Sequence, residues 1–262
     1  MSDVWLSAVL LFLVGVSDAA EPFRIATFNV NYGNLNGREV LDAIAEADAD
    51  ILCLQETTVK AESFLRQQLA TTYPEFHSAG HQGKYFAERF VFASRIKPKS
   101  LRFVPPSNGL FGFYIAEFEV NAKPLRVVNA HLTPVSTEGA TTLAGVLAGI
   151  ARSEDTRASE AKAIVEHISD NSATIVLGDF NSLSTFQAPQ ALAAAGLVDS
   201  FASVHSDADR HPTWHWPTRP LPVRLRIDYI FHSRHLKTKK SAIVKRGNSD
   251  HFPVVSELVI TD

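Results

Sequence analysis

The sequence predicts an α/β fold in which helices pack on layers of β-sheet. Two observations carry this prediction. Near the N-terminus apolar strand patterns alternate with amphipathic helix patterns, and in the middle of the chain several strand patterns follow one another. The length of 262 residues suits one large α/β domain or two small ones, and it is long enough to bury a sizeable core.

The first elements follow the order strand, helix, strand. Residues 23–31, FRIATFNVN, alternate as a strand does, and residues 37–47, GREVLDAIAEA, place their apolar side chains on one helical face. Residues 48–56, DADILCLQE, predict a buried strand, and residues 62–70 predict a second helix. This order predicts a layered βα core.

The middle and the end of the chain continue in the same two patterns. Residues 76–131 are rich in Val, Ile, Phe and Tyr with Pro and Gly breaks, which predicts an antiparallel meander. Residues 135–157 fit either a helical insertion or a mobile loop beside the site. The remaining elements are helices at 158–168 and 188–195 and strands at 174–177, 226–231 and 253–260.

Residues 1–20 predict a signal peptide and leave residues 21–262 as a single domain. The run from Val4 to Val16 is almost continuously apolar, is too short to span a bilayer comfortably, and is followed by small residues. No Lys or Arg precedes Arg24, so an uncleaved N-terminal anchor is the alternative. We therefore expect an exported protein, secreted or periplasmic, without a stable membrane span.

Charge and cysteine content exclude several classes of function. The chain has 25 Lys and Arg against 28 Asp and Glu, and the net charge of −3 gives no overall field that attracts nucleic acid or anionic membrane. A polyanionic substrate therefore needs a local positive site such as a bound metal. Cys53 is the only cysteine, which excludes an intramolecular disulfide and a multi-cysteine metal site. No obligate protein partner is indicated, and we expect a monomer.

Polar side chains recur where the strand patterns end. If these strands lie side by side, their ends converge on one edge of a sheet, where α/β proteins commonly place their sites. Carboxylate and amide oxygens without cysteine suit Mg²⁺, with Mn²⁺ or Ca²⁺ as alternatives, and histidines suit acid and base chemistry near neutral pH. The combination fits hydrolysis of a phosphate ester. The residues are Asn29, Asn31, Glu56, His131, Asp179, Asn181, Asp228, Asp250 and His251.

Other features carry weaker signals. The sequence contains no GxSxG, HExxH, GxxxxGK[ST] or GxGxxG motif, which argues against serine hydrolases, thermolysin-like proteases, P-loop enzymes and Rossmann dehydrogenases. Trp214 and Trp216 fit either a substrate wall or packing. The lysines of residues 237–246 fit either phosphate contacts or a solvated face, and Arg157 and Arg226 fit either phosphate contacts or ion pairs.

The ordered motifs TFNVN, LQET, NAHL, GDFN, IDYIF and SDHFPV resemble those of the endonuclease/exonuclease/phosphatase superfamily across residues 24–260. The resemblance implies a four-layered α/β sandwich with two central mixed β-sheets flanked by helices and the site at one edge. GDFN and SDH are specific as an ordered pair, whereas NAHL or LQE alone would be weak.

The resemblance also implies a metal site. Glu56 would be the main ligand, with Asn29 beside it and Asp250 completing or supporting the site. Asn31 stands where AP endonucleases have an aspartate, and His131 stands where they carry a tyrosine-containing motif. These departures favour the deoxyribonuclease, phosphatase and sphingomyelinase side of the superfamily over abasic-site repair.

The remaining residues would act on the phosphate. Asp179 would orient or deprotonate the attacking water, and Asn181 would hold a phosphate oxygen. His251 would contact the scissile phosphate and be oriented by Asp228, while His131 would donate to the phosphate or the leaving group.

We therefore expect a Mg²⁺-dependent phosphoesterase that hydrolyses phosphodiester bonds, a nuclease or phosphodiesterase that uses metal-assisted in-line attack by water. DNA and RNA are candidate substrates. One alternative is a phosphatase or phospholipase C-type enzyme that acts on small or lipid-bound phosphate esters. Another is a catalytically silent binding protein with the same fold, and a zinc hydrolase is the least favoured.

Overall fold

The computed structural model describes most of the chain after the predicted leader, and residues 1–20 lie outside the described residues. Within the described part, no helix combines the length and the apolar character that a membrane span requires. The described residues are 21–31, 37–80, 89–136, 143–168, 171–216 and 223–261.

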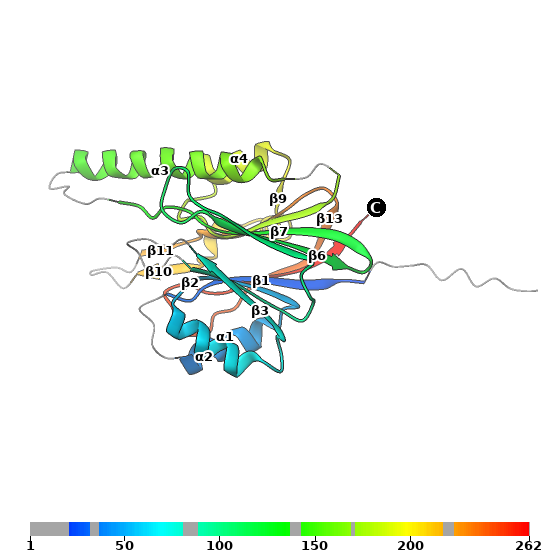
Figure 1. Cartoon of the computed structure of the whole chain (residues 1–262). Coiled ribbons are helices and arrows are strands. Elements are labelled where there is room, and N and C mark those ends of the chain that lie inside the picture. The colour runs from blue at the N-terminus through cyan, green and yellow to red at the C-terminus, as the bar shows by residue number, and fades with distance from the viewer. Residues whose placement is uncertain are drawn as a thin grey trace, which may run out of the picture.

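Two six-stranded mixed sheets face each other in the middle of the molecule (Figure 1). The first sheet has the order β13-β14-β1-β2-β4-β3. Its strands are β1 (Phe23–Asn29), β2 (Ile51–Thr57), β3 (Glu75–Gly80), β4 (Arg89–Ser94), β13 (Leu236–Ile243) and β14 (Val254–Ile260).

The second sheet has the order β5-β6-β7-β8-β12-β9. A separate pair of short strands, β10 (Trp214–Trp216) and β11 (Val223–Leu225), belongs to neither large sheet. The strands of the second sheet are β5 (Ser100–Val104), β6 (Phe113–Val120), β7 (Lys123–His131), β8 (Ala173–Asp179), β9 (Val198–Asp199) and β12 (Asp228–His232).

Helices cover the outer faces of both sheets (Figure 1). The helices α1 (Gly37–Ala47) and α2 (Val59–Leu69) pack on the first sheet, and α3 (Leu143–Val165) and α4 (Gln187–Ala194) pack on the second. One apolar cluster fills the space between the sheets, and one lies under each helical layer. The predicted four-layered α/β sandwich is thus confirmed.

Two predicted helices differ from the observed ones in extent. The second helix begins at Val59 because Thr58 caps it, with its side-chain oxygen accepting from the Ala61 N–H at 3.1 Å. The helix predicted at 158–168 is the C-terminal part of the longer α3. Of the residues 135–157, for which the sequence predicts either a helical insertion or a mobile loop, 143–157 take the helical alternative, and 137–142 lie outside the described residues.

The predicted meander is divided between the two sheets. Strands β3 and β4 pair in the first sheet, whereas β5, β6 and β7 pair in the second. The lysine-rich residues 237–246 contribute the edge strand β13, which the sequence did not predict. Polar side chains on an edge strand obscure the apolar alternation that identifies a strand.

Candidate active site

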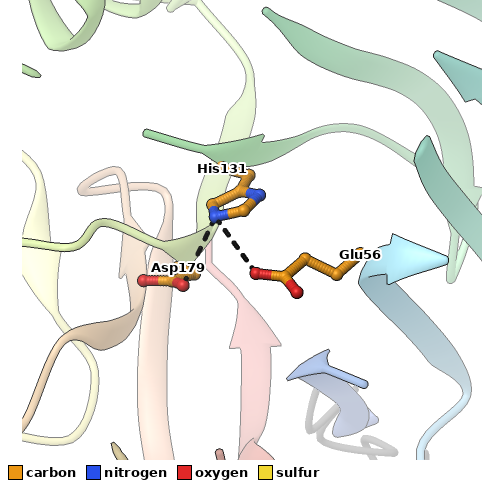
Figure 2. A group of neighbouring side chains, drawn as sticks. All are labelled: Glu56, His131 and Asp179. Carbon is orange, nitrogen blue, oxygen red and sulfur yellow. Dashed lines mark ion pairs between the residues drawn. The ribbon is translucent and has the colours of Figure 1, made fainter. Parts of the chain in front are cut away.

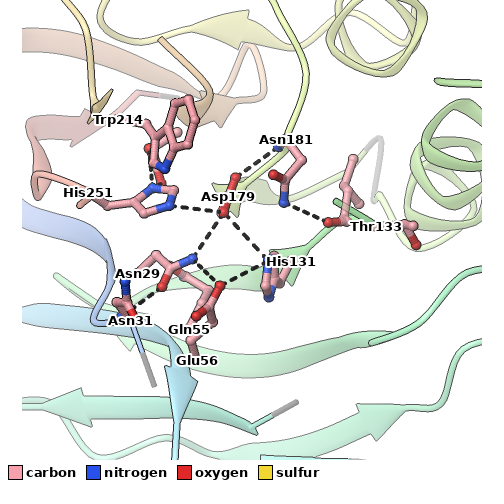
Figure 3. Close-up of polar contacts among 12 residues, drawn as sticks. Asn29, Asn31, Gln55, Glu56, His131, Thr133, Asp179, Asn181, Trp214 and His251 are labelled. Atoms are coloured by element: carbon pink, nitrogen blue, oxygen red, sulfur yellow. Dashed lines mark hydrogen bonds and ion pairs between the residues drawn. The ribbon is translucent and has the colours of Figure 1, made fainter. Parts of the chain in front are cut away.

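The predicted site residues meet where the strands of both sheets end (Figure 3). Strands β1 and β2 run parallel and end near Asn29 and Glu56, and β7 and β8 run parallel with His131 opposite Asp179. Strand β12 runs antiparallel to β8, so its first residue, Asp228, lies on the other side of Asp179. The chain thus brings polar ends from both sheets to one edge of the sandwich.

The glycine of the GDFN motif is required by a close approach of two strands. Gly178 has φ +141°, and a Cβ there would lie 1.8 Å from the Ala130 carbonyl oxygen. After Phe180 the chain turns through Asn181 at φ +49°, whose N–H donates to Asp179 Oδ1 at 2.8 Å. The Asn181 side-chain amide donates to the Leu132 carbonyl at 3.0 Å. The motif therefore both ends β8 and orients the Asp179 carboxylate.

Asn29 joins the carboxylates of the two sheets. Its Nδ2 donates to Glu56 Oε1 at 2.9 Å and to Asp179 Oδ2 at 3.0 Å. Its Oδ1 accepts from the Asn31 N–H at 3.0 Å. A single amide therefore keeps two carboxylates close together, an arrangement that favours a positively charged ligand.

His131 lies between the same two carboxylates (Figure 2). Its Nε2 is 3.7 Å from Glu56 Oε1 and 3.5 Å from Asp179 Oδ2, and it makes no hydrogen bond in the described structure. Phe111 stacks on the ring at 4.1 Å between centroids. Burial, with a smaller contribution from the positive charge of His251, lowers the pKa of His131 to about 3. His131 is therefore neutral at pH 7.

His251 is held by a carboxylate. Its Nδ1 donates to Asp228 at 3.0 Å, and its Nε2 lies 3.6 Å from Asp179 Oδ2. Burial alone lowers the pKa of His251, but the charges of Asp228 and Asp179 outweigh it and raise the pKa to about 10. His251 is therefore a cation at neutral pH, and Asp228 fixes its orientation.

Asp179 is 1% exposed and sits at the centre of the cluster. Burial raises the pKa of Asp179 to about 7. The negative charges of Asp228 and Glu56 raise this pKa further. The positive charge of His251 and the hydrogen bond from the Asn181 N–H lower it. A carboxyl group with this pKa exchanges a proton near neutral pH, as a general base or acid must.

Asp250 is hydrogen-bonded to Asn31 and Trp214, the two residues that form the rim of the site. Its Oδ1 accepts from Asn31 Nδ2 at 2.6 Å, and its Oδ2 accepts from the Trp214 indole at 2.9 Å. Trp214 also forms an isolated bridge with His251, which ties the short strand β10 to the site. The side chain of Trp216, the other predicted wall residue, lies outside the described residues.

The two arginines take the ion-pair alternative. Arg157 is 0% exposed and its guanidinium donates to Glu154 at 2.9 Å and 3.0 Å. Arg226 pairs with Asp199 at 2.7 Å and with Asp209 at 3.0 Å. Both guanidinium groups are buried and paired with carboxylates, although the Asp209 partner of Arg226 is itself exposed.

Sequence reasoning missed residues that shape the site without reacting. Ser249 accepts from the His251 N–H at 3.1 Å and donates to the Asn29 carbonyl at 2.8 Å. Gln55, next to Glu56, lies inside the sandwich. Ser249 and Gln55 lie in the SDHFPV and LQET motifs, so the sequence contained a signal for both. Phe111, which stacks on His131, comes from a loop outside these motifs, and the sequence contained no signal for its role.

Two overlapping groups of side chains offer ligand atoms that all lie within 4.8 Å of one another. One group is Glu56, His131 and Asp179, and the other is Asp179, Asp228 and His251. The first combines two carboxylates with a neutral imidazole, so it is the group whose charge and donor types suit a divalent cation.

The fold and the site together define a phosphoesterase-type α/β sandwich. The sequence model that describes the endonuclease/exonuclease/phosphatase family matches residues 26–251 of the chain. The chain belongs to this family. Among proteins whose sequences have been curated, none is significantly similar to the chain.

Solved structures share the fold at low sequence identity. TDP2 of D. rerio, in complex with a single-strand DNA product, is 18% identical with a TM-score of 0.69, and the match covers 90% of this chain and 98% of that one. The 3′ phosphatase NExo from Neisseria, bound to a product DNA hairpin, is 21% identical with a TM-score of 0.65, covering 89% and 98%. An endonuclease/exonuclease/phosphatase from Beutenbergia cavernae is 18% identical with a TM-score of 0.66, covering 92% and 72%.

Proposed function

We propose that the protein is a Mg²⁺-dependent phosphodiesterase and that it acts as a nuclease. One observation carries the proposal: Asp179 lies between His131 and His251 at an edge where strands of both sheets end. A base, a cation and a neutral imidazole within reach of one point are the groups that attack on a phosphate ester requires.

The residues present fit a divalent cation. Glu56 and Asp179 accept from the same Asn29 amide, and the neighbouring His131 Nε2 is buried without a hydrogen bond in the described structure. Hard cations prefer such carboxylate oxygens. We assign Glu56 to hold the cation and Asn29 to hold the Glu56 carboxylate in place. A bound cation supplies positive charge that neutralises the phosphate.

The residues of the chain have different roles in the proposed reaction. Asp179 accepts the proton of the attacking water, and Asn181 fixes Asp179 through its N–H. His251, kept cationic by Asp228, binds a phosphate oxygen. His131 donates a hydrogen bond to the phosphate or the leaving group. Asp250 supports the site by holding Asn31 and Trp214 at its rim.

A nucleic acid substrate is supported by two of the structural neighbours, since the TDP2 structure holds a single-strand DNA product and the NExo structure holds a DNA hairpin. DNA is therefore the first substrate to test, followed by RNA.

A cavity beside Glu56 favours a second candidate. The cavity has a volume of about 180 Å³, and its walls include Val30, Val40, Phe64 and Lys60. Apolar walls with one lysine suit the organic group of a small phosphate ester or lipid headgroup. A phosphatase or phospholipase C-type activity is therefore the alternative.

The deciding experiment is nicking of supercoiled plasmid by the purified protein with Mg²⁺ and with EDTA. We expect nicking with Mg²⁺ only, and none by Asp179→Ala. The matched control is Lys240→Ala, a substitution at an 80% exposed side chain, which should nick as wild type does. Equal nicking by the Asp179→Ala protein would mean contamination and count against the proposal.

Absence of nicking would turn attention to the alternative. Bis-p-nitrophenyl phosphate, p-nitrophenyl phosphate and sphingomyelin vesicles then distinguish a diesterase, a phosphatase and a phospholipase C-type enzyme. No turnover of any of them with Mg²⁺, Mn²⁺ or Ca²⁺ would support the silent binding protein.

We also propose that the protein is an exported monomer. Support comes from the apolar run and the small residues within residues 1–20. N-terminal sequencing of protein recovered from the periplasm or the medium tests cleavage, and an intact Met1 would indicate the uncleaved anchor. Light scattering of the purified protein tests the monomer.

A further inference from the structure

The carboxylate of Glu56 is aimed by an irregularity in strand β2. Leu54 pairs with Val91 of β4, and Thr57 pairs with Arg89, so three steps along β2 match two along its partner. The extra residue is a β-bulge, a device that redirects a side chain. Glu56 adopts φ +55° there, a conformation that few non-glycine residues take.

The side chain of Asn129 fills this bulge from the opposite sheet. Its Nδ2 donates to the Leu54 carbonyl at 3.1 Å and to the Val91 carbonyl at 3.2 Å, so it serves both strands that border the bulge. Its Oδ1 accepts from Gln55 Nε2 at 2.6 Å. Asn129 belongs to β7, so these bonds cross the interior of the sandwich.

Gln55 extends the link to a third strand. It donates to Thr27 Oγ1 of β1 at 2.9 Å, and its Oε1 accepts from the same hydroxyl at 3.3 Å. Thr27, Gln55 and Asn129 are each 0% exposed. In a dry interior an unmade hydrogen bond is costly, so this network permits one arrangement of the three strands.

The network lies directly behind the site. Asn129 precedes His131 by two residues and therefore shares its face of β7, while Gln55 adjoins Glu56 (Figure 3). The same bonds thus connect the strand that carries Glu56 with the strand that carries His131.

We propose that Asn129 is a positioning residue that acts through Gln55 and the β2 bulge to hold Glu56 in the geometry that binds the metal. The proposal rests on the proposed metal-dependent function. Outer residues that orient a metal ligand typically change metal affinity by 10–100-fold when replaced.

The test is Mn²⁺ binding by the full chain, measured by electron paramagnetic resonance of free Mn²⁺. Asn129→Leu keeps the branched shape of the side chain, with a larger volume, but removes both donations and the acceptor for Gln55. We expect its Mn²⁺ affinity to fall at least about tenfold. Its reaction should need correspondingly more Mg²⁺ for half-maximal rate while kcat at saturating Mg²⁺ stays near that of wild type.

Three further variants make the result decisive. Gln55→Leu breaks the same link from the other side and should give the same loss. Asn129→Ala admits water in place of the amide and serves if the leucine variant fails to fold. Ser256→Ala is the matched control, because Ser256 is also 0% exposed and bonded to Ser200 and Ser241 but lies away from the site.

The outcomes separate the two proposals. If wild type binds no Mn²⁺, the proposed metal function fails. If wild type binds Mn²⁺ and folded Asn129 and Gln55 variants bind it equally well, the positioning role is overturned and the metal function stands. An equal loss in Ser256→Ala would also overturn it, since any buried polar change would then have the same effect.

Discussion

The two sides of the site shift the pKa of a histidine in opposite directions. On one side His131 packs flat on Phe111, and burial lowers its pKa to about 3. On the other side His251 is bonded to Asp228, which with Asp179 raises its pKa to about 10 against the effect of burial. Both rings are nearly inaccessible and burial lowers the pKa of each, so the difference in charge comes from the carboxylate that is hydrogen-bonded to His251 alone, Asp228.

The comparison shows how one protein obtains a neutral and a positively charged side chain from the same residue type, histidine. A neutral imidazole and an imidazolium coexist on either side of one carboxylate oxygen, Asp179 Oδ2, which lies 3.5 Å from His131 Nε2 and 3.6 Å from His251 Nε2. Experiments that exchange these surroundings therefore test the assignment directly.

The largest effect is expected from Asp228→Asn. Without this carboxylate the strongest of the charges that raise the pKa of His251 is gone, so this pKa should fall from about 10 and His251 should lose its proton at a lower pH. We expect kcat to fall about a thousandfold, within the range that a lost charged or acid group produces. The pH–rate profile checks this, with Asp207→Asn as an exposed control. A wild-type profile with a reduced rate would contradict the electrostatic role.

Phe111→Ala should have the next largest effect and act on the other histidine. It opens the stack to water, so the pKa of His131 should rise from about 3 toward its usual range. A buried Phe to Ala change typically costs about 3–5 kcal/mol in unfolding free energy. NMR titration of the imidazole measures the pKa, and Phe111→Leu, which keeps the site apolar, should leave it low.

The pH dependence of stability should reveal both histidines in EDTA-treated protein. His131 has a lowered pKa in the folded state, so its contribution is lost as pH falls from 6.5 toward 3. His251 has a raised pKa, so its contribution is complete below pH 6.5 and is lost as pH rises toward 10. Each histidine by itself gives a slope of about 1.4 kcal/mol per pH unit, and below pH 7 the raised pKa of Asp179 gives a slope opposite to that of His131, so the contribution of His131 is read as the difference between wild type and the His131 variant.

Urea unfolding across this range distinguishes the two sides. His131→Gln should flatten the acid limb, and His251→Gln should flatten the alkaline limb. If either variant flattened the opposite limb, the two charge assignments would be reversed.

The smallest effect is expected far from both histidines. Lys240 is 80% exposed and its ammonium lies 3.9 Å from Glu257. Such a surface pair contributes at most about 1 kcal/mol, so Lys240→Ala should change stability little and leave Mg²⁺ dependence unchanged. Kinetics at several Mg²⁺ concentrations check this, and a loss comparable to that of Glu56→Ala would contradict the role given to Glu56.

Sequence reasoning predicted the layers of the fold, and the residues that it proposed for a site lie together in the structure, because both leave local signals. Asp179 and Asn181 follow an apolar strand, and Glu56 follows another, so their convergence could be expected. The division of residues 76–131 between two sheets left no such signal, since it depends on which strands pair across the sandwich.

Other features escaped for equally physical reasons. The first half of α3 is rich in Ala and Gly and carries little periodicity, so its helix was only one of two alternatives. The contact between Phe111 and His131 and the bond between Gln55 and Asn129 join residues distant in the sequence. Such contacts decide pKa values and side-chain aim, and they exist only once the sheets have assembled.

The pair of strands β10 and β11 has a consequence for how this enzyme fold can change its substrate. The pair belongs to neither large sheet and meets the site through the Trp214 bridge to His251 and the indole bond to Asp250. Thr213, whose hydroxyl accepts from the Ile227 and Asp228 N–H groups, would be kept together with Trp214. Replacing the other residues of the pair would unpair no strand of the two large sheets. Under the proposed function, a library confined to the outer residues of β10 and β11 would therefore vary the surroundings of a substrate while Asp179, His131 and His251 stay unchanged.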